Sequence, residues 1–176
     1  GRTLSREHAL ETAGILNEIR PDFIRVRTFA IHPLSPLQEM VEEGTFDPMN
    51  DEEVVGEIRL LLENLDKMPT HFRCGDFSMN LLMQVDGRLD KDKAAMLREI
   101  DRYLALTREQ KQAYSLLQRS YPGMRLLDAV EDAGLLKQLA GKIRELEKEK
   151  DGFDEYIRRL MTFQLPQPQT GAWRRS

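Results

Sequence analysis

The sequence predicts an α+β fold that is mostly helical, and two observations lead to this prediction. Two short runs rich in β-branched and aromatic residues, 22–31 and 70–74, alternate with segments of helical spacing, which is the element order of a parallel sheet. After Asp76 no further β-rich run follows, and every later segment has helical spacing. We therefore expect a small two-stranded parallel sheet in the first half and only helices in the second.

The composition is that of a soluble domain with its own hydrophobic core. The chain has 176 residues, 40% of them hydrophobic, and a formal net charge of −4. A chain of this length buries about 70% of the surface that it exposes when unfolded. No apolar run approaches the ~20 residues of a membrane span, so no membrane partner is expected. The mild acidity argues against a nucleic-acid partner without excluding one.

The cysteine count limits the redox and metal chemistry. Cys74 is the single cysteine, which excludes an internal disulfide, a cysteine-only metal site and an iron–sulfur cluster held by this chain alone. We interpret Cys74 as a small apolar core residue and expect a reducing, cytoplasmic location. The chain starts with Gly1 instead of Met, which suggests a piece of a longer protein.

The first helix is expected from Arg6 to about Arg20, with Ser5 as its N-cap and Pro21 as its stop. Leu4 would form a hydrophobic staple. Its buried side is expected to carry Leu10, Ala13, Leu16 and Ile19.

The strand 22–31 follows, and its two faces differ in chemistry. Side chains alternate across a strand, so one face would pack on helices and the other would present two guanidinium groups. The packing face is expected to carry Ile24, Val26, Thr28 and Ala30, and the other Phe23, Arg25, Arg27 and Phe29.

Two helices and a second strand are expected next. Ser35, with Pro36 and Gln38, opens a short helix to about Glu43. Asn50 and Glu53 open a longer one. Its apolar stripe consists of Val54, Ile58, Leu61, Leu62 and Leu65, and in the strand Thr70–Cys74 the outer face carries His71 and Arg73 and the inner face Phe72 and Cys74.

The second half is expected to be a helical subdomain. Asp90 would cap one helix, and Thr107 with Gln110 forms a capping box for the next. Two further helices are expected on either side of Gly152, and Tyr121-Pro122-Gly123 is expected to be a turn. The expected organisation is a sheet-bearing part over 1–89, the helical subdomain over 90–163 and a disordered tail over 164–176.

The arginine-bearing strand faces are the main candidate site. Buried charges are costly unless they are paired or face a solvated cavity, so a strand face with several cations indicates a polar lumen or an anion site. Guanidinium groups would bind a carboxylate or phosphate there. The alternative is that the arginines pair with carboxylates elsewhere or face water.

Two further residues are candidates because each follows a strand end. His32 lies just past the first strand, at the edge where parallel α/β folds place their ligands, although a solvated loop histidine is the alternative. Asp76 follows Gly75 after the second strand and either reaches a ligand or serves a turn, the latter being favoured.

The first 105 residues carry a family resemblance. The stretch Leu16–Thr28, continued by His32–Leu37, resembles the late barrel region of radical S-adenosylmethionine (radical SAM) enzymes of the methylthiotransferase-like and elongator-like group. In that group a hydrophobic-Arg-hydrophobic-Arg strand leads to a Pro-Gly-Thr-Pro-Leu turn, and here Leu34 replaces the glycine. The helix from Asp51 and the strand with Arg73, followed by Asp76 and Asn80, also resemble one branch of that superfamily.

The resemblance implies the terminal β/α units of a partial (β/α) barrel followed by a helical subdomain. It implies S-adenosylmethionine and a [4Fe–4S] cluster in the full-length protein, neither bound by this chain alone, since the Cys-x-x-x-Cys-x-x-Cys loop of the family is missing. The remainder of the barrel would be the partner. By the resemblance, the segment from Phe29 to His32 would lie near S-adenosylmethionine, and the lumen near the unknown substrate would be lined by Arg25, Arg27, His71 and Arg73.

Three functions remain open from the sequence. The first is the C-terminal fragment of a radical SAM enzyme, not catalytic alone. The second is a stand-alone helical protein-interaction module without enzymatic activity. The third is a small domain that binds an anion through its arginine face. Exposed apolar edges would favour the first, and a fully covered core would favour the second.

Overall fold

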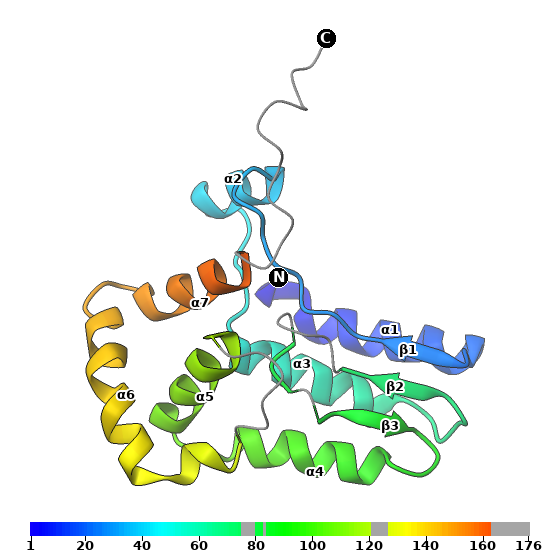
Figure 1. Ribbon diagram of the computed structural model, residues 1–176. Coiled ribbons are helices and arrows are strands. Elements are labelled where there is room, and N and C mark those ends of the chain that lie inside the picture. The colour runs from blue at the N-terminus through cyan, green and yellow to red at the C-terminus, as the bar shows by residue number, and fades with distance from the viewer. Residues whose placement is uncertain (75–79, 83, 121–126, 163–176) are drawn as a thin grey trace, which may run out of the picture.

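The computed structural model describes residues 1–74, 80–82, 84–120 and 127–162, and its fold is α+β and mostly helical, as predicted (Figure 1). The predicted turn at 121–123 and the predicted disordered tail at 164–176 lie outside the described residues. The helices are α1 (Ser5–Ile19), α2 (Pro36–Glu42), α3 (Asp51–Asn64), α4 (Lys93–Leu104), α5 (Arg108–Ser120), α6 (Ala133–Leu146) and α7 (Gly152–Thr162), and the strands are β1 (Phe23–Arg25), β2 (His71–Arg73) and β3 (Asp86–Arg88).

The sheet has three strands in the order β1-β2-β3. Strands β1 and β2 are parallel, as predicted, and the helices between them form the crossover. The prediction of no strand after Asp76 was wrong, because β3 pairs with β2 in antiparallel fashion. Propensity did not predict β3, because Asp86-Gly87-Arg88 contains no β-branched or aromatic residue.

Strand β1 is shorter than the predicted run 22–31. Strand β2 ends at Arg73, and among the described residues no strand pairs with the backbone beyond Val26. The side chain of Asn80 forms hydrogen bonds with this backbone instead. Its Oδ1 accepts from the backbone N–H of Thr28 at 2.6 Å, and its Nδ2 donates to the carbonyl of Val26 at 2.6 Å. The predicted alternation of faces holds along this segment, because the outer set is exposed and the inner set is buried or half-buried.

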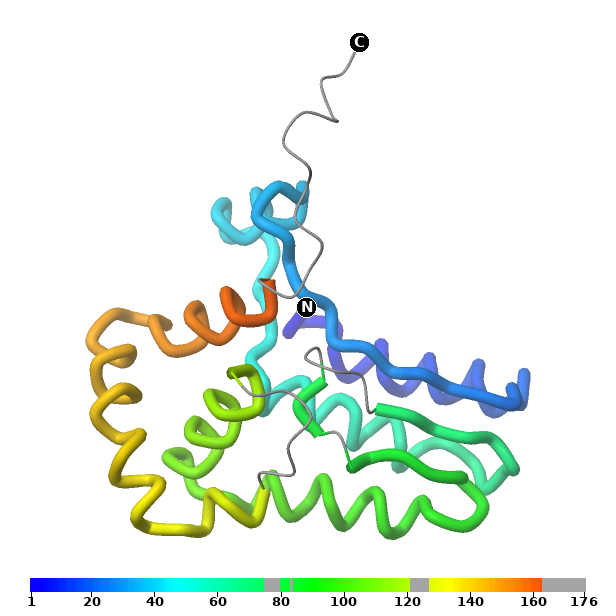
Figure 2. The backbone as a smooth tube through the Cα atoms, viewed as in Figure 1, coloured from blue at the N-terminus to red at the C-terminus, as the bar shows by residue number. Residues whose placement is uncertain are grey.

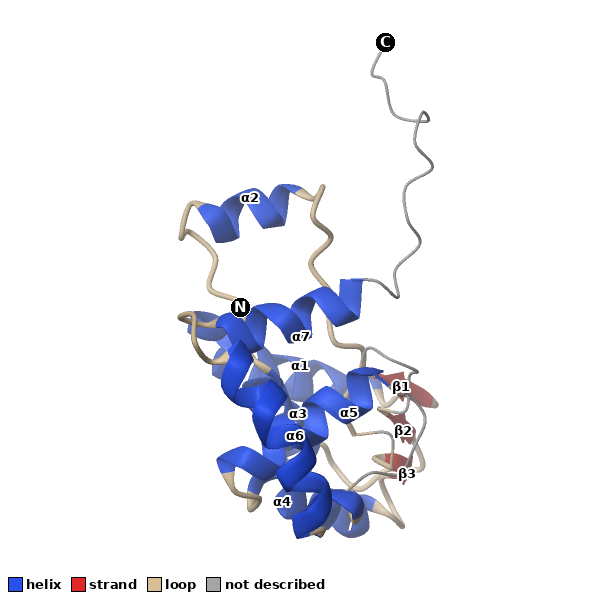
Figure 3. Cartoon of the chain, turned by 60° about the vertical axis from the view of Figure 1, so that its left-hand side comes forward, coloured by secondary structure: helices blue, strands red, loops and turns tan. Residues whose placement is uncertain are grey.

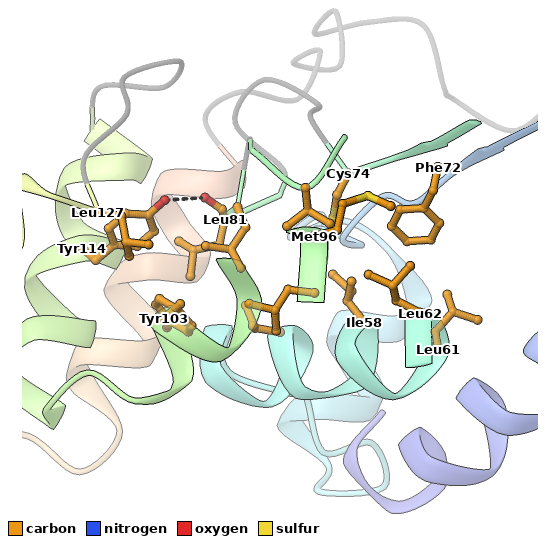
Figure 4. Close-up of a cluster of buried hydrophobic side chains, with 14 of the residues drawn as sticks. Ile58, Leu61, Leu62, Phe72, Cys74, Leu81, Met96, Tyr103, Tyr114 and Leu127 are labelled. Atoms are coloured by element: carbon orange, nitrogen blue, oxygen red, sulfur yellow. Dashed lines mark hydrogen bonds between the residues drawn. The ribbon is translucent and has the colours of Figure 1, made fainter. Parts of the chain in front are cut away.

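One face of the sheet packs on helices and the other is open. Ile24 and Phe72 face inward and are buried, and Figure 4 shows Phe72 beside Leu61 and Leu62 of α3. Helix α3 packs between α1 and α4. In Figure 3 the three strands lie at one margin of the molecule, with the helices on the other side. Among the described residues, helices thus cover only one side of the sheet.

The helix ends test the predicted caps. The capping boxes Asn50/Glu53 and Thr107/Gln110 are present with both reciprocal bonds. The prediction for Ser5 was wrong: α1 begins at Ser5 itself, and the Ser5 hydroxyl donates to Glu57 of α3.

Other end residues also differ from the predictions. Ile19 was expected to be buried and is 65% exposed, while Leu4, expected to form a staple, is exposed as well. Asp90 does not cap α4, which starts at Lys93, because the Asp90 carboxylate instead forms an ion pair with Arg88 at 2.6 Å. The predicted stripe of α3 is buried or half-buried throughout.

The helices α5, α6 and α7 follow one another in the left part of Figure 2, on the side away from the sheet. Buried side chains from both predicted halves belong to one cluster, and the hydroxyl of Tyr114 on α5 donates to the Leu81 carbonyl (Figure 4). The boundary at 89/90 stays a prediction. Helix α2 differs from the rest: it has no buried residue and stands off from the other helices in Figures 1 and 3. Within the described residues, no helix has the length and apolar character to cross a membrane.

Candidate functional site

The open face of the sheet gathers the predicted cationic side chains from two strands. The strand register sets Phe23 opposite His71 and Arg25 opposite Arg73. Cross-strand neighbours of like charge destabilise a sheet unless an anion compensates them. A negative charge beside Arg25 and Arg73 would offset this repulsion.

Asp86 of β3 supplies one such charge. The register places it opposite Arg73, and its Oδ2 lies 3.4 Å from Arg73 Nε. Its Oδ1 lies 2.5 Å from Nε2 of His71, whose ring stacks on Phe23 with centroids 5.6 Å apart. One carboxylate thus holds a histidine and an arginine side by side on a solvent-accessible face. The alternative that an arginine pairs with a carboxylate is correct for Arg73.

The remaining predicted site residues lie elsewhere. Arg27 follows β1 and is exposed, on the same side of its segment as Arg25, and it also lines a cavity beyond the strand end. His32 lies in the turn before α2, where its Nδ1 accepts from the Leu34 N–H at 3.1 Å, a local contact. Asp76 lies outside the described residues. The roles of all three stay predictions.

Cys74 is a core residue, as predicted. Burial raises the pKa of its thiol to about 12, with a smaller contribution from Asp86. A thiol of that kind stays protonated at neutral pH and is a poor metal ligand or nucleophile. Among the described residues, no group of three or more His, Cys, Asp or Glu side chains is placed to hold a metal ion.

The sequence reasoning missed Asp86 and gave Asn80 no role. Asp86 escaped because β3 was not predicted, yet a signal was present: Val85, Gly87 and Leu89 alternate with the polar residues, and Val85 and Leu89 are buried. Asn80 is fully buried, and its amide also donates to the carbonyl of Cys74. No sequence signal shows which backbone groups a single asparagine satisfies.

Comparison of the chain with models of known protein families, with curated proteins and with solved structures found no match.

Proposed function

We propose that this chain is the C-terminal part of a radical SAM iron–sulfur enzyme, in which it closes the barrel and lines the substrate and S-adenosylmethionine site, without being catalytic alone. The observation that carries the proposal is the apolar surface around the edge strand β1. Ile15 and Ile19 of α1 and Phe23 of β1 are each at least half exposed. Exposed apolar side chains of this kind are expected where a neighbouring part of a longer fold has been removed.

The sheet geometry supports the same proposal. A (β/α) barrel consists of parallel strands with helices outside and an inner face that looks into the lumen. The parallel pair β1 and β2 has α1 and α3 on one face, and the other face is open. Among the described residues β1 pairs with β2 alone, so its second edge is available for a preceding strand. In the whole enzyme the open face would be the lumen wall.

The proposal assigns a binding role to the open face. Arg25, His71 and Arg73 would hold an anionic group of the substrate, with Asp86 fixing the orientation of the last two. The cluster and S-adenosylmethionine would supply the radical chemistry. This chain offers the cluster no ligand, since its single cysteine is buried and protonated. The cluster ligands would come from the preceding barrel segment.

The decisive experiment is to read the coding region upstream of the Gly1 codon and express the longer product. An in-frame Cys-x-x-x-Cys-x-x-Cys is expected, and anaerobic reconstitution with iron and sulfide should give a [4Fe–4S] spectrum and cleavage of S-adenosylmethionine. A start codon immediately before Gly1 would overturn the proposal and leave the stand-alone helical interaction module.

The open face favours a second candidate, an anion-binding domain, which a titration separates from the first. Phosphate or sulfate binding to the 176-residue chain, weakened by Arg25→Ala with Arg73→Ala, would support it. The matched control is Arg6→Ala, because Arg6 is an exposed arginine of α1, away from the sheet face. If the unaltered chain binds neither anion, this candidate is removed.

A further inference from the structure

A cavity of about 900 Å³ lies between α1, α3, α5, α7 and the segment that follows β1. Its wall is predominantly apolar, and its volume lies in the range of small-molecule sites. Helices from both predicted halves of the chain therefore contribute to one concave site. The buried apolar side chains in its lining are Ala9, Ile58, Leu61, Phe153, Ile157 and Met161.

A histidine–glutamate pair joins α1 to α3 in the lining of this cavity. Nδ1 of His8 lies 2.8 Å from Oε1 of Glu57. The second carboxylate oxygen of Glu57 accepts from the hydroxyl of Ser5. All three residues line the cavity. The Glu57 carboxylate is thus held at both oxygens, and it holds the imidazole ring of His8 through one nitrogen.

This contact sets the hydrogen-bonding role of the second ring nitrogen, Nε2. A carboxylate can only accept, so Nδ1 of His8 carries the proton that it shares with Glu57. In the neutral ring Nε2 is then an acceptor. Within the part of the chain that the structure describes, Nε2 has no hydrogen-bond partner, and the His8 side chain is 68% exposed. The cavity lining therefore offers an accessible acceptor in a fixed tautomer.

Buried apolar side chains adjoin this acceptor on both helices. Ala9 directly follows His8 on α1, and Ile58 directly follows Glu57 on α3. Leu61 lies one helical turn beyond Glu57, on the same face of α3. All three apolar residues line the cavity. A ligand that donates to His8 thus has apolar surface next to its polar group, which is the usual arrangement of a small-molecule site.

The charges in the lining disfavour an anionic ligand. Carboxylates outnumber the lysine and arginine side chains there. Two of the cations already donate to lining carboxylates, Lys111 to Glu52 at 2.7 Å and Arg108 to Glu147 at 2.6 Å. A carboxylate or phosphate would meet like charges without a free partner. The acceptor at His8 is itself uncharged, so a neutral donor matches it without a counter-ion.

We propose that this cavity binds a neutral molecule with a hydroxyl group on an apolar body, and that the hydroxyl donates to Nε2 of His8. The apolar body packs on Ala9, Ile58 and Leu61 and, from the side of α7, on Ile157. The inference is independent of the proposed radical SAM function, because neither helix of the His8–Glu57 pair contributes to the open face of the sheet.

The test compares 4-phenylbutanol with its methyl ether, which keeps the apolar body but has no donor. Amide NMR titrations of the 176-residue chain at pH 8, which favours the neutral imidazole, should show the alcohol binding roughly three- to tenfold more tightly, as expected for one neutral hydrogen bond. His8→Phe should abolish this difference and leave binding of the ether unchanged. The matched control is Glu11→Phe, which adds the same ring at an exposed position of α1 outside the lining.

A measurement on the unaltered chain keeps the proposal falsifiable if His8→Phe fails to fold. Proton–nitrogen correlation spectra should show His8 with its proton on Nδ1, and phenylbutanol should shift the Nε2 signal of His8 but not the ring signals of His71. Tighter binding of phenylbutyrate or phenylbutylamine than of the alcohol would overturn the proposal. So would no binding, equal binding of alcohol and ether, or an advantage of the alcohol that persists in His8→Phe.

Discussion

The surface of the first 40 residues differs from the surface of the helical half. Every large hydrophobic side chain that is exposed in the described residues lies between positions 4 and 40, and examples are Ile19 at 65% and Phe29 at 70%. In the described helices after residue 89, the corresponding leucine, isoleucine and methionine side chains are buried or half-buried. The described helices α4 to α7 thus leave no large hydrophobic side chain exposed, whereas α1, β1 and the segment to α2 leave apolar surface open.

This difference teaches that periodicity predicts which residues share a face but not whether that face has a neighbour. The stripe of α3 and the stripe of α1 follow the same rule of spacing. Leu62 of α3, a helix that packs between α1 and α4, is fully buried, while Ile19 at the end of α1 is 65% exposed. The four predictions that follow compare the two kinds of surface directly.

The largest effect is expected for Leu62→Ala. Leu62 is fully buried in the central helix, so its truncation should lower the free energy of unfolding by roughly 3–5 kcal/mol through lost burial and a cavity. The matched variant Ile19→Ala should change it by less than about 0.5 kcal/mol. Urea denaturation of both variants measures the contrast. A loss of comparable size at Ile19 would mean that the α1 end is covered in solution.

A somewhat smaller loss is expected for Asn80→Leu. The substitution keeps the branching and the number of non-hydrogen atoms but removes the donors and acceptor that satisfy backbone groups of Val26, Thr28 and Cys74. Because these buried backbone groups would then lack hydrogen-bond partners, the free energy of unfolding should fall by roughly 2–4 kcal/mol.

The loss of stability in Asn80→Leu should be concentrated at the strand ends that Asn80 binds. Hydrogen exchange should accelerate at Thr28 more than at Ile100 of α4 at matched global stability. Equal acceleration at both amides would contradict the idea that Asn80 holds the strand ends.

The sequence predicted what depends on near neighbours along the chain. The capping boxes of α3 and α5 follow from local patterns, whereas the parallel pair β1 and β2 was predicted from the order of β-rich and helical segments; the structure has all of them. Ser5 failed as a cap because a distant carboxylate, Glu57, takes its hydroxyl. Tertiary partners override local signals of this size, which are worth about 1 kcal/mol.

The candidate site was predicted in part for the same reason. Alternation correctly placed His71 and Arg73 on one exposed face, because period two is a property of the strand alone. Their shared partner Asp86 was missed, since β3 forms through pairing with β2 and not through its own propensity. The cavity between α1 and α7 depends on helices far apart in sequence, so no local pattern indicates it.

The third prediction compares two helix caps. Asn50→Ala should destabilise the protein by about 1 kcal/mol, because the Asn50 side chain accepts from the Glu53 N–H at the start of a buried helix. Ser35→Ala removes the equivalent bond to Gln38 in α2, which has no buried residue. Its effect on global unfolding should be close to zero. Equal effects on the urea midpoint would show that α2 is packed in solution.

The smallest effect is a pH dependence with opposite signs at two aspartates. Burial raises the pKa of Asp154, so the folded state holds that proton more tightly than the unfolded state. The stability of the unaltered chain relative to Asp154→Asn should therefore be greatest below the ordinary aspartate pKa of ~3.9 and fall as the pH rises through the folded-state value. Urea unfolding at stepped pH values measures this difference.

Asp90 provides the opposite sign within the same chain. The hydrogen bond from Arg88 lowers the pKa of the Asp90 carboxyl, so its contribution to stability is present above the ordinary value and is lost as the pH falls through the folded-state pKa. Relative to Asp90→Asn, the unaltered chain should therefore gain stability with rising pH, and salt should screen this exposed pair.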